Sequence, residues 1–282
     1  MQPASPNHAP EDLGEEYHTR SGTPMIGAYS VNQMDDFYTA LSRGEMKPTG
    51  VMNYLQRLYI AERTRPGDRM VDVCCGRGLQ LPVLYRYQPA LGSYTGLDIS
   101  PDHLAEAHAR REDLETIYPT CFPVEFHEID VSQPWPELEP FDIAVYTSAL
   151  EHLPRELAID SLQRTAAALS PTGRLYLSTP NTTGPPPRKL QHRVHVYEWA
   201  HEELVTVLDK VGLVVEDVVG ILPPLTPEAT EDAVGQRFGA DAAALYRRMS
   251  QHTPDALLGP VVATALEGDA TEVLNVCSRR SA

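Results

Sequence analysis

Between residues 69 and 220, short apolar runs alternate with segments whose apolar residues recur at helical spacing. The apolar runs cover residues 69–74, 93–98, 124–129, 141–147, 174–178 and 213–220, and a last run covers 272–278. Ser100 followed by Pro101 marks one helix start, and Gly212 marks the end of another helix. Strands that alternate with helices form mostly parallel sheets, because right-handed crossovers return the chain to the same edge. We therefore expect an α/β fold with a doubly wound, mostly parallel seven-stranded sheet and helical cap segments.

The segments outside the alternating core predict accessory regions. Residues 1–16 are polar, with neither a basic start nor an apolar run, and predict a disordered tail rather than a signal peptide. Residues 17–65 predict an N-terminal helical cap or lid, and residues 223–270 predict a helical insertion that caps the substrate. We assign the ligand-binding α/β core to residues 66–222, and the final core strand with its tail to residues 271–282.

Charge and cysteine spacing exclude several classes of function. The formal net charge is −16, so most of the surface repels nucleic acid and anionic membranes. No apolar run approaches the roughly 20 residues that a membrane span needs. The four cysteines lack C-x-x-C spacing, which indicates neither a metal site nor a disulfide framework. We expect a cytoplasmic protein with no metal, nucleic-acid partner or membrane partner; the oligomeric state stays open, with a homodimer as one alternative.

A turn with two glycines follows the first apolar run. Asp72 and Cys74 lie at the end of this run, and Gly76 and Gly78 stand between it and the next helix. Open α/β sheets bind nucleotide-like ligands at this place, at the carboxyl ends of their strands. The dinucleotide pattern G-x-G-x-x-G is not met, because Leu81 occupies the third glycine position. No G-K-[ST] follows the turn, which excludes a P-loop.

Asp98 ends the second apolar run, about 20 residues after Gly78. An acidic side chain at this position can accept hydrogen bonds from both hydroxyls of a ribose. Together these residues resemble the class I S-adenosylmethionine-dependent methyltransferases, whose first strand ends in an acidic residue followed by G-x-G-x-G. The resemblance covers about residues 66–220 and the last strand. Asp72 takes the acidic position, and Cys74 replaces the first glycine.

The resemblance implies a Rossmann-like methyltransferase fold that binds S-adenosylmethionine as its cofactor. By this resemblance, Asp98 binds the ribose, Ile99 packs against the adenine and Asp130 contacts the adenine amino group. Tyr29 belongs to an aromatic-rich segment that in this family often lies over the cofactor as a lid. The expected cofactor-binding residues are Tyr29, Asp72, Cys74, Gly76, Gly78, Asp98, Ile99, Asp130, Val131 and Thr147.

The acceptor is far less constrained than the cofactor. His152 and His195 are candidate general bases, since a histidine titrates near neutral pH, although either could instead pack or orient its loop. Methyltransferases of nucleobase amines carry an Asn/Asp-Pro-Pro-aromatic motif after the fourth strand, and residues 147–150 lack it. We expect in-line methyl transfer to an oxygen or nitrogen of a small, biosynthetic molecule. Two alternatives stay open: a non-methylating enzyme that cyclises or cleaves the cofactor, releasing methylthioadenosine, and a non-catalytic cofactor-binding protein.

Overall fold

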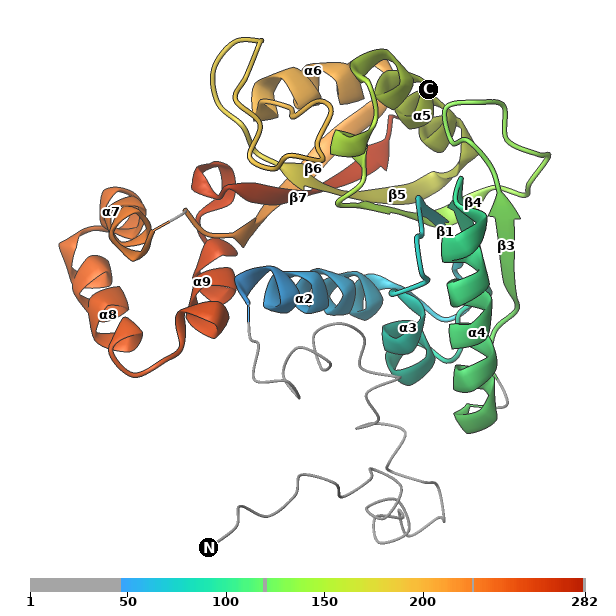
Figure 1. Ribbon diagram of the computed structural model, residues 1–282, viewed down its shortest axis with the longest axis horizontal. Helices are drawn as coiled ribbons and strands as arrows, with labels where there is room; N and C mark the ends of the chain where they lie inside the picture. Colours follow the sequence, from blue (N-terminus) through green and yellow to red (C-terminus); the bar gives the residue numbers. More distant parts are fainter. Residues whose placement is uncertain (1–46, 119–120, 225, 281–282) are drawn as a thin grey trace, which may run out of the picture.

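The computed structural model describes residues 47–118, 121–224 and 226–280 (Figure 1). Its strands are β1 Arg69–Val73, β2 Ser93–Asp98, β3 Val124–Glu128, β4 Phe141–Thr147, β5 Leu169–Pro180, β6 Leu213–Leu222 and β7 Glu272–Arg279. They form a seven-stranded sheet in the order β3-β2-β1-β4-β5-β7-β6. Strands β1 to β5 are parallel, and β7 lies antiparallel between β5 and β6. The predicted doubly wound, mostly parallel sheet is confirmed.

Helices cover both faces of the sheet. The helices of the described chain are α2 Pro48–Arg63, α3 Leu81–Tyr87, α4 Pro101–Ile117, α5 Arg155–Ala168, α6 His201–Lys210, α7 Pro227–Phe238, α8 Ala240–Ser250 and α9 Asp255–Ala263, with short 3-10 helices at Leu150–His152 and Glu267–Asp269. Val71 and Val73 of β1 pack in one core layer with α5 and α6. Met70 packs in the opposite layer with α2, α3 and α4, because successive strand residues point to opposite faces. Figure 1 shows α5 and α6 on one side of the sheet and α2 and α3 on the other.

Local signals at the element ends account for the expected boundaries. The Ser100 hydroxyl oxygen accepts a hydrogen bond from the His103 backbone N–H at 3.3 Å and so caps α4. Gly212, at φ +86°, follows α6. Strand β5 begins at Leu169 rather than at the expected Arg174, because Leu169 already pairs with Phe141 before a register shift. Residues 170–173, which precede the expected run 174–178, therefore lie within β5.

The accessory segments lie at one edge of the sheet. Residues 223–270 contain α7, α8 and α9, which share a small core of Val234, Tyr246, Leu258 and Leu266. Helix α9 packs against both α2 and β6. Of the expected cap at residues 17–65, the described part contains α2; the expected tail 1–16 and Tyr29 lie outside the described residues. No helix of the described chain is both long enough and apolar enough to cross a membrane.

Candidate functional site

The turn after β1 has an unusual backbone. Cys74, Gly76 and Gly78 all adopt left-handed conformations, with φ of +57°, +53° and +68°. For an L-residue this region costs roughly 1–2 kcal/mol, whereas glycine enters it freely. A Cβ on Gly76 would meet no atom of the described residues within 4 Å, whereas a Cβ on Gly78 would lie 3.2 Å from the Ala107 Cβ of α4. Gly76 therefore leaves the backbone open to a ligand, and Gly78 lets α4 pack closely.

The Asp98 carboxylate ties this turn to the end of β2. One oxygen, Oδ2, accepts the Gly76 N–H at 2.8 Å, and the other, Oδ1, accepts the Ser100 N–H at 2.9 Å. The Asp98 residue is only 7% exposed. A carboxylate has about four acceptor positions, so about two stay available for an adjacent ligand. Because Asp98 lines the cavity, this remaining acceptor capacity is available to a ligand there.

A cavity of about 480 Å³ opens at the carboxyl ends of β1, β2 and β4. It brings together seven residues expected from the sequence: Cys74, Gly76, Asp98, Ile99, Asp130, Val131 and His152. The remaining lining residues are Ser100, His103, Ile129, Ser148, Ala149, Leu153 and Leu157. The Ile99 side chain stands 66% exposed, which leaves an apolar surface beside the acidic groups. An apolar surface next to hydrogen-bond acceptors fits an adenosine, so these lining residues agree with the expected cofactor.

Asp130 presents a second carboxylate to the cavity. Its Oδ1 accepts the Ser132 N–H at 3.0 Å and the Ser132 hydroxyl at 2.7 Å. These bonds turn the side chain back on its own loop and fix it. Oδ2 is not used in either bond and can accept from an amino group. Val131 beside it is buried at 4% exposure and adds apolar lining.

Four expected residues do not line the cavity: Asp72, Gly78, Thr147 and His195. Asp72 lies beneath the turn at 5% exposure, where the Tyr94 hydroxyl donates to its Oδ2 at 2.6 Å. Burial raises the pKa of Asp72 to about 7. The Asp72 side chain is thus tied to Tyr94 of β2 in the core and does not face the cavity. The expected role of Tyr29 falls outside the described residues.

Ser148 lines the cavity in place of the expected Thr147. It is left-handed at φ +49°, and its backbone N–H donates to the Ser178 Oγ at 3.0 Å. The Ser148 hydroxyl donates to Oε1 of Glu272 at 3.0 Å. No sequence pattern predicts that Ser148 is left-handed or that it bonds to Glu272 on β7. Strained residues of this kind are frequent at binding sites.

The two candidate histidines lie side by side, and His152 alone of the two lines the cavity. The His152 and His195 ring centroids are 5.2 Å apart, and the rings meet edge to face. His152 lines the cavity, and partial burial lowers its pKa. His195 is held from behind, with its Nδ1 2.5 Å from Oε1 of the buried Glu198. The sequence suggested both histidines separately, and the fold places them side by side.

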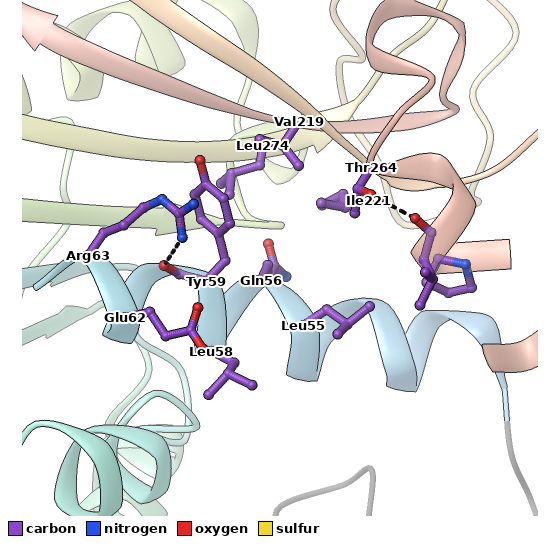
Figure 2. Close-up of a pocket in the computed structure, with 12 residues that line it drawn as sticks. Leu55, Gln56, Leu58, Tyr59, Glu62, Arg63, Val219, Ile221, Thr264 and Leu274 are labelled. Atoms are coloured by element: carbon purple, nitrogen blue, oxygen red, sulfur yellow. Dashed lines mark hydrogen bonds between the residues drawn. The ribbon is translucent and has the colours of Figure 1, made fainter. Parts of the chain in front are cut away.

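A second cavity of about 360 Å³ lies between α2, β6 and α9 (Figure 2). Its lining is mostly apolar and includes Leu55, Val219, Ile221 and Leu274. Figure 2 shows Arg63 folded over Tyr59, with its Nη1 donating to the Tyr59 carbonyl oxygen at 3.2 Å. This cavity shares no lining residue with the first and contains none of the site residues expected from the sequence.

Comparisons with solved structures give the same fold. The small RNA methyltransferase HEN1 matches with a TM-score of 0.58 and 17% identity over 82% of this chain, which corresponds to 25% of HEN1. The N-methyltransferase NodS from Bradyrhizobium japonicum WM9, solved with S-adenosyl-L-homocysteine, matches with a TM-score of 0.54 and 13% identity over 89% of this chain and 96% of NodS. The [4+2]-cyclase SpnF matches with a TM-score of 0.51 and 21% identity over 81% of each chain.

Sequence comparison places the chain in a family. No curated protein sequence matches it significantly. A family model described as a methyltransferase domain matches residues 50–217. The match spans more than half of the chain and includes β1 to β5, the glycine turn and Asp98. The chain therefore belongs to the methyltransferase domain family, and it has the fold of the class I S-adenosylmethionine-dependent methyltransferases.

Proposed function

We propose that this protein transfers the methyl group of S-adenosylmethionine to an oxygen or nitrogen of a small molecule. The observation that carries the proposal is the Asp98 carboxylate, fixed by two backbone N–H groups at the mouth of a 480 Å³ cavity. In this arrangement Asp98 would accept from the ribose hydroxyls, and Asp130 would accept from the adenine amino group. Ile99 would cover the adenine ring. The left-handed Gly76 would allow the backbone to approach the methionine part.

Methyl transfer requires the protein mainly to align the methyl donor with the acceptor. When bound, the cofactor supplies a methyl group already activated on a sulfonium. The chain's own residues hold the two reactants in line and exclude water. Ser148 and His152 line the part of the cavity next to His195, and we place the acceptor there. Since its pKa is lowered, His152 is neutral at pH 7 and could take a proton from the acceptor.

The acceptor class follows from charge and motif. A net charge of −16 opposes binding of a polyanion. The nucleobase-amine motif is absent after β4, where residues 147–150 read Thr-Ser-Ala-Leu. HEN1 is a small RNA methyltransferase, but the match covers only 25% of that chain. A small-molecule acceptor therefore agrees best with this chain. The four free cysteines fit the reducing cytoplasm, where we place the protein.

One alternative has a specific observation behind it. SpnF, which shares this fold over 81% of both chains, is a [4+2]-cyclase. The same architecture therefore also serves an enzyme named for a different reaction. A reaction that consumes the cofactor without an acceptor, releasing methylthioadenosine, belongs to the same alternative.

The products separate these functions. The protein is incubated with methyl-labelled S-adenosylmethionine and a panel of hydroxyl- and amine-bearing metabolites, and the products are identified by mass spectrometry. We expect S-adenosylhomocysteine and a labelled acceptor in equal amounts. Methylthioadenosine formed without any acceptor, or a rearranged acceptor with the cofactor left intact, would instead support the alternative and refute methyl transfer.

A further inference from the structure

Glu151, His152 and His195 form a cluster that the expected cofactor contacts do not use. One carboxylate oxygen of Glu151 and one ring nitrogen of each histidine all lie within 4.8 Å of one another. Two histidines and one carboxylate are a ligand set that proteins use for divalent transition metals. We propose that these three residues bind a divalent transition-metal ion at the acceptor end of the cofactor cavity. The sequence predicted no metal, because the three ligands lack the spacing of a recognised motif.

The histidines are already held in the orientation that a metal ligand needs. The Nδ1 of His195 lies 2.5 Å from Oε1 of Glu198, and the Nδ1 of His152 lies 3.3 Å from the Val194 carbonyl oxygen. A carbonyl oxygen can only accept, so Nδ1 of His152 carries the proton and Nε2 keeps its lone pair. A carboxylate imposes the same tautomer on His195. Metal-bound histidines almost always make such a bond from their other nitrogen.

Glu198 is built as a supporting carboxylate. It is 1% exposed, and besides His195 it accepts the Gln191 N–H at 2.6 Å and the Thr182 hydroxyl at 2.5 Å. These bonds from neutral donors stabilise its charged form. A buried, charged carboxylate behind a histidine raises the basicity of that histidine as a ligand.

The backbone joins the two halves of the cluster. Glu151 and His152 follow β4 in a 3-10 helix, whereas His195 belongs to the loop after β5. The Val196 and Tyr197 N–H groups both donate to the Glu151 carbonyl oxygen, at 2.8 and 3.2 Å. The ligands are thus brought together by main-chain bonds and not by flexible side chains alone.

Buried carboxyl groups accompany the cluster. Glu151, Glu198 and Glu272 are 2%, 1% and 9% exposed. Buried carboxylates are normally paired with cations or coordinate metals. Three protein ligands leave further coordination positions for water or for an oxygen of the acceptor.

This placement deepens the proposed function, on which it rests, by selecting an oxygen-bearing acceptor. In methyl transfer to a hydroxyl, the carbon–sulfur bond breaks, a carbon–oxygen bond forms, and the hydroxyl proton is released to water. A metal ion that binds the hydroxyl oxygen lowers its pKa and holds it in place. The ligand role would replace the general-base role suggested for His152 and His195.

The test is a Co²⁺ titration of the chelator-treated full-length protein, followed by visible absorption and by metal content after gel filtration. We expect one Co²⁺ per chain with absorption bands distinct from those of aqueous Co²⁺, and no displacement by Mg²⁺, because imidazole ligands suit transition metals better. The variants Glu151→Gln and His195→Ala should weaken binding at least about a hundredfold. Glu198→Gln, which leaves the three proposed ligands in place but weakens the support of His195, should reduce Co²⁺ binding roughly 10- to 100-fold.

His252→Ala is the matched control, because His252 is exposed after α8 and far along the chain from the cluster; it should bind Co²⁺ like the wild type. Circular dichroism of each variant checks folding, and the isosteric Glu151→Gln serves if His195→Ala unfolds. No retained Co²⁺ in a wild type that still binds S-adenosylmethionine would overturn the metal site alone, as would unchanged Co²⁺ binding by Glu151→Gln. A folded wild type that fails to bind S-adenosylmethionine would instead overturn the proposed function.

Discussion

Replacing Gly76 by alanine separates the ligand role of the glycine turn from its structural role. Gly76 is left-handed at φ +53°, and its new Cβ would have no neighbour within 4 Å in the part of the chain that the structure describes. The change therefore creates no clash with those residues. The backbone cost for an L-residue is about 1–2 kcal/mol, and the stiffer unfolded chain offsets about 0.4–1 kcal/mol of it. The net loss of unfolding free energy is about 0.5–1 kcal/mol, or roughly 1–4 °C in Tm.

Binding should respond far more than stability. Gly76 lines the cofactor cavity, so its added methyl group enters the space where a ligand would contact the backbone. We expect the affinity for S-adenosylmethionine to fall at least tenfold, which is about 1.4 kcal/mol. Calorimetric titration measures the affinity, and differential scanning calorimetry measures the stability of the same samples.

Gly67→Ala is the matched control. Gly67 is also left-handed, at φ +85°, and its Cβ would likewise meet nothing within 4 Å, but it lies before β1 and does not line the cavity. It should lose similar stability and keep wild-type affinity. If Gly76→Ala binds S-adenosylmethionine within about twofold of Gly67→Ala, the turn does not contact the cofactor and the reasoning is refuted.

Three further predictions concern the surroundings of the turn. Burial raises the pKa of Asp72 from 3.8 to about 7, so between these pH values the folded state holds a proton that the unfolded state has lost. The free energy of unfolding of the wild type should therefore fall as pH rises from about 4 to 7, and urea unfolding should show Asp72→Asn gaining a few kcal/mol over wild type across that window. A gain that does not depend on pH would contradict this pKa. Gly96→Ala should destabilise by about 1–3 kcal/mol, because its Cβ would lie 2.6 Å from the Phe126 ring; an unchanged Tm would show that β3 yields easily. Ile99→Asp should weaken S-adenosylmethionine binding without lowering Tm, since this residue is 66% exposed; equal affinity would remove Ile99 from the adenine site.

The elements of the core could be predicted because their signals are local. The runs 93–98 and 141–147 match β2 and β4, and the Ser100–Pro101 start of α4 is confirmed. The boundary of β5 was missed because the pairing of Leu169 with Phe141 is a tertiary contact. Apolar patterns indicate which residues of a strand are buried, but they do not indicate which residues of the neighbouring strand they pair with.

The site was predictable where residues follow strand ends. Asp98 and Asp130 reach one cavity because parallel strands share a carboxyl edge. Asp72 also ends a strand region, yet its side chain lies on the core side beneath the turn, bonded to Tyr94. Glu198 and Glu272 carried no sequence signal, because only the folded loop after β5 and the antiparallel β7 bring them beside His195 and Ser148.

The central claim is that Asp98 anchors S-adenosylmethionine in this cavity. The most direct measurement is a calorimetric titration of S-adenosylmethionine into the wild type, Asp98→Ala and Asp102→Ala; Asp102 carries the same charge four residues on but is exposed and does not line the cavity. Two charge-assisted hydrogen bonds contribute about 1.5 kcal/mol or more each, so Asp98→Ala should bind at least about a hundredfold more weakly. Asp102→Ala should bind like the wild type. Equal affinity of Asp98→Ala and wild type, or no binding by a folded wild type, would contradict the account.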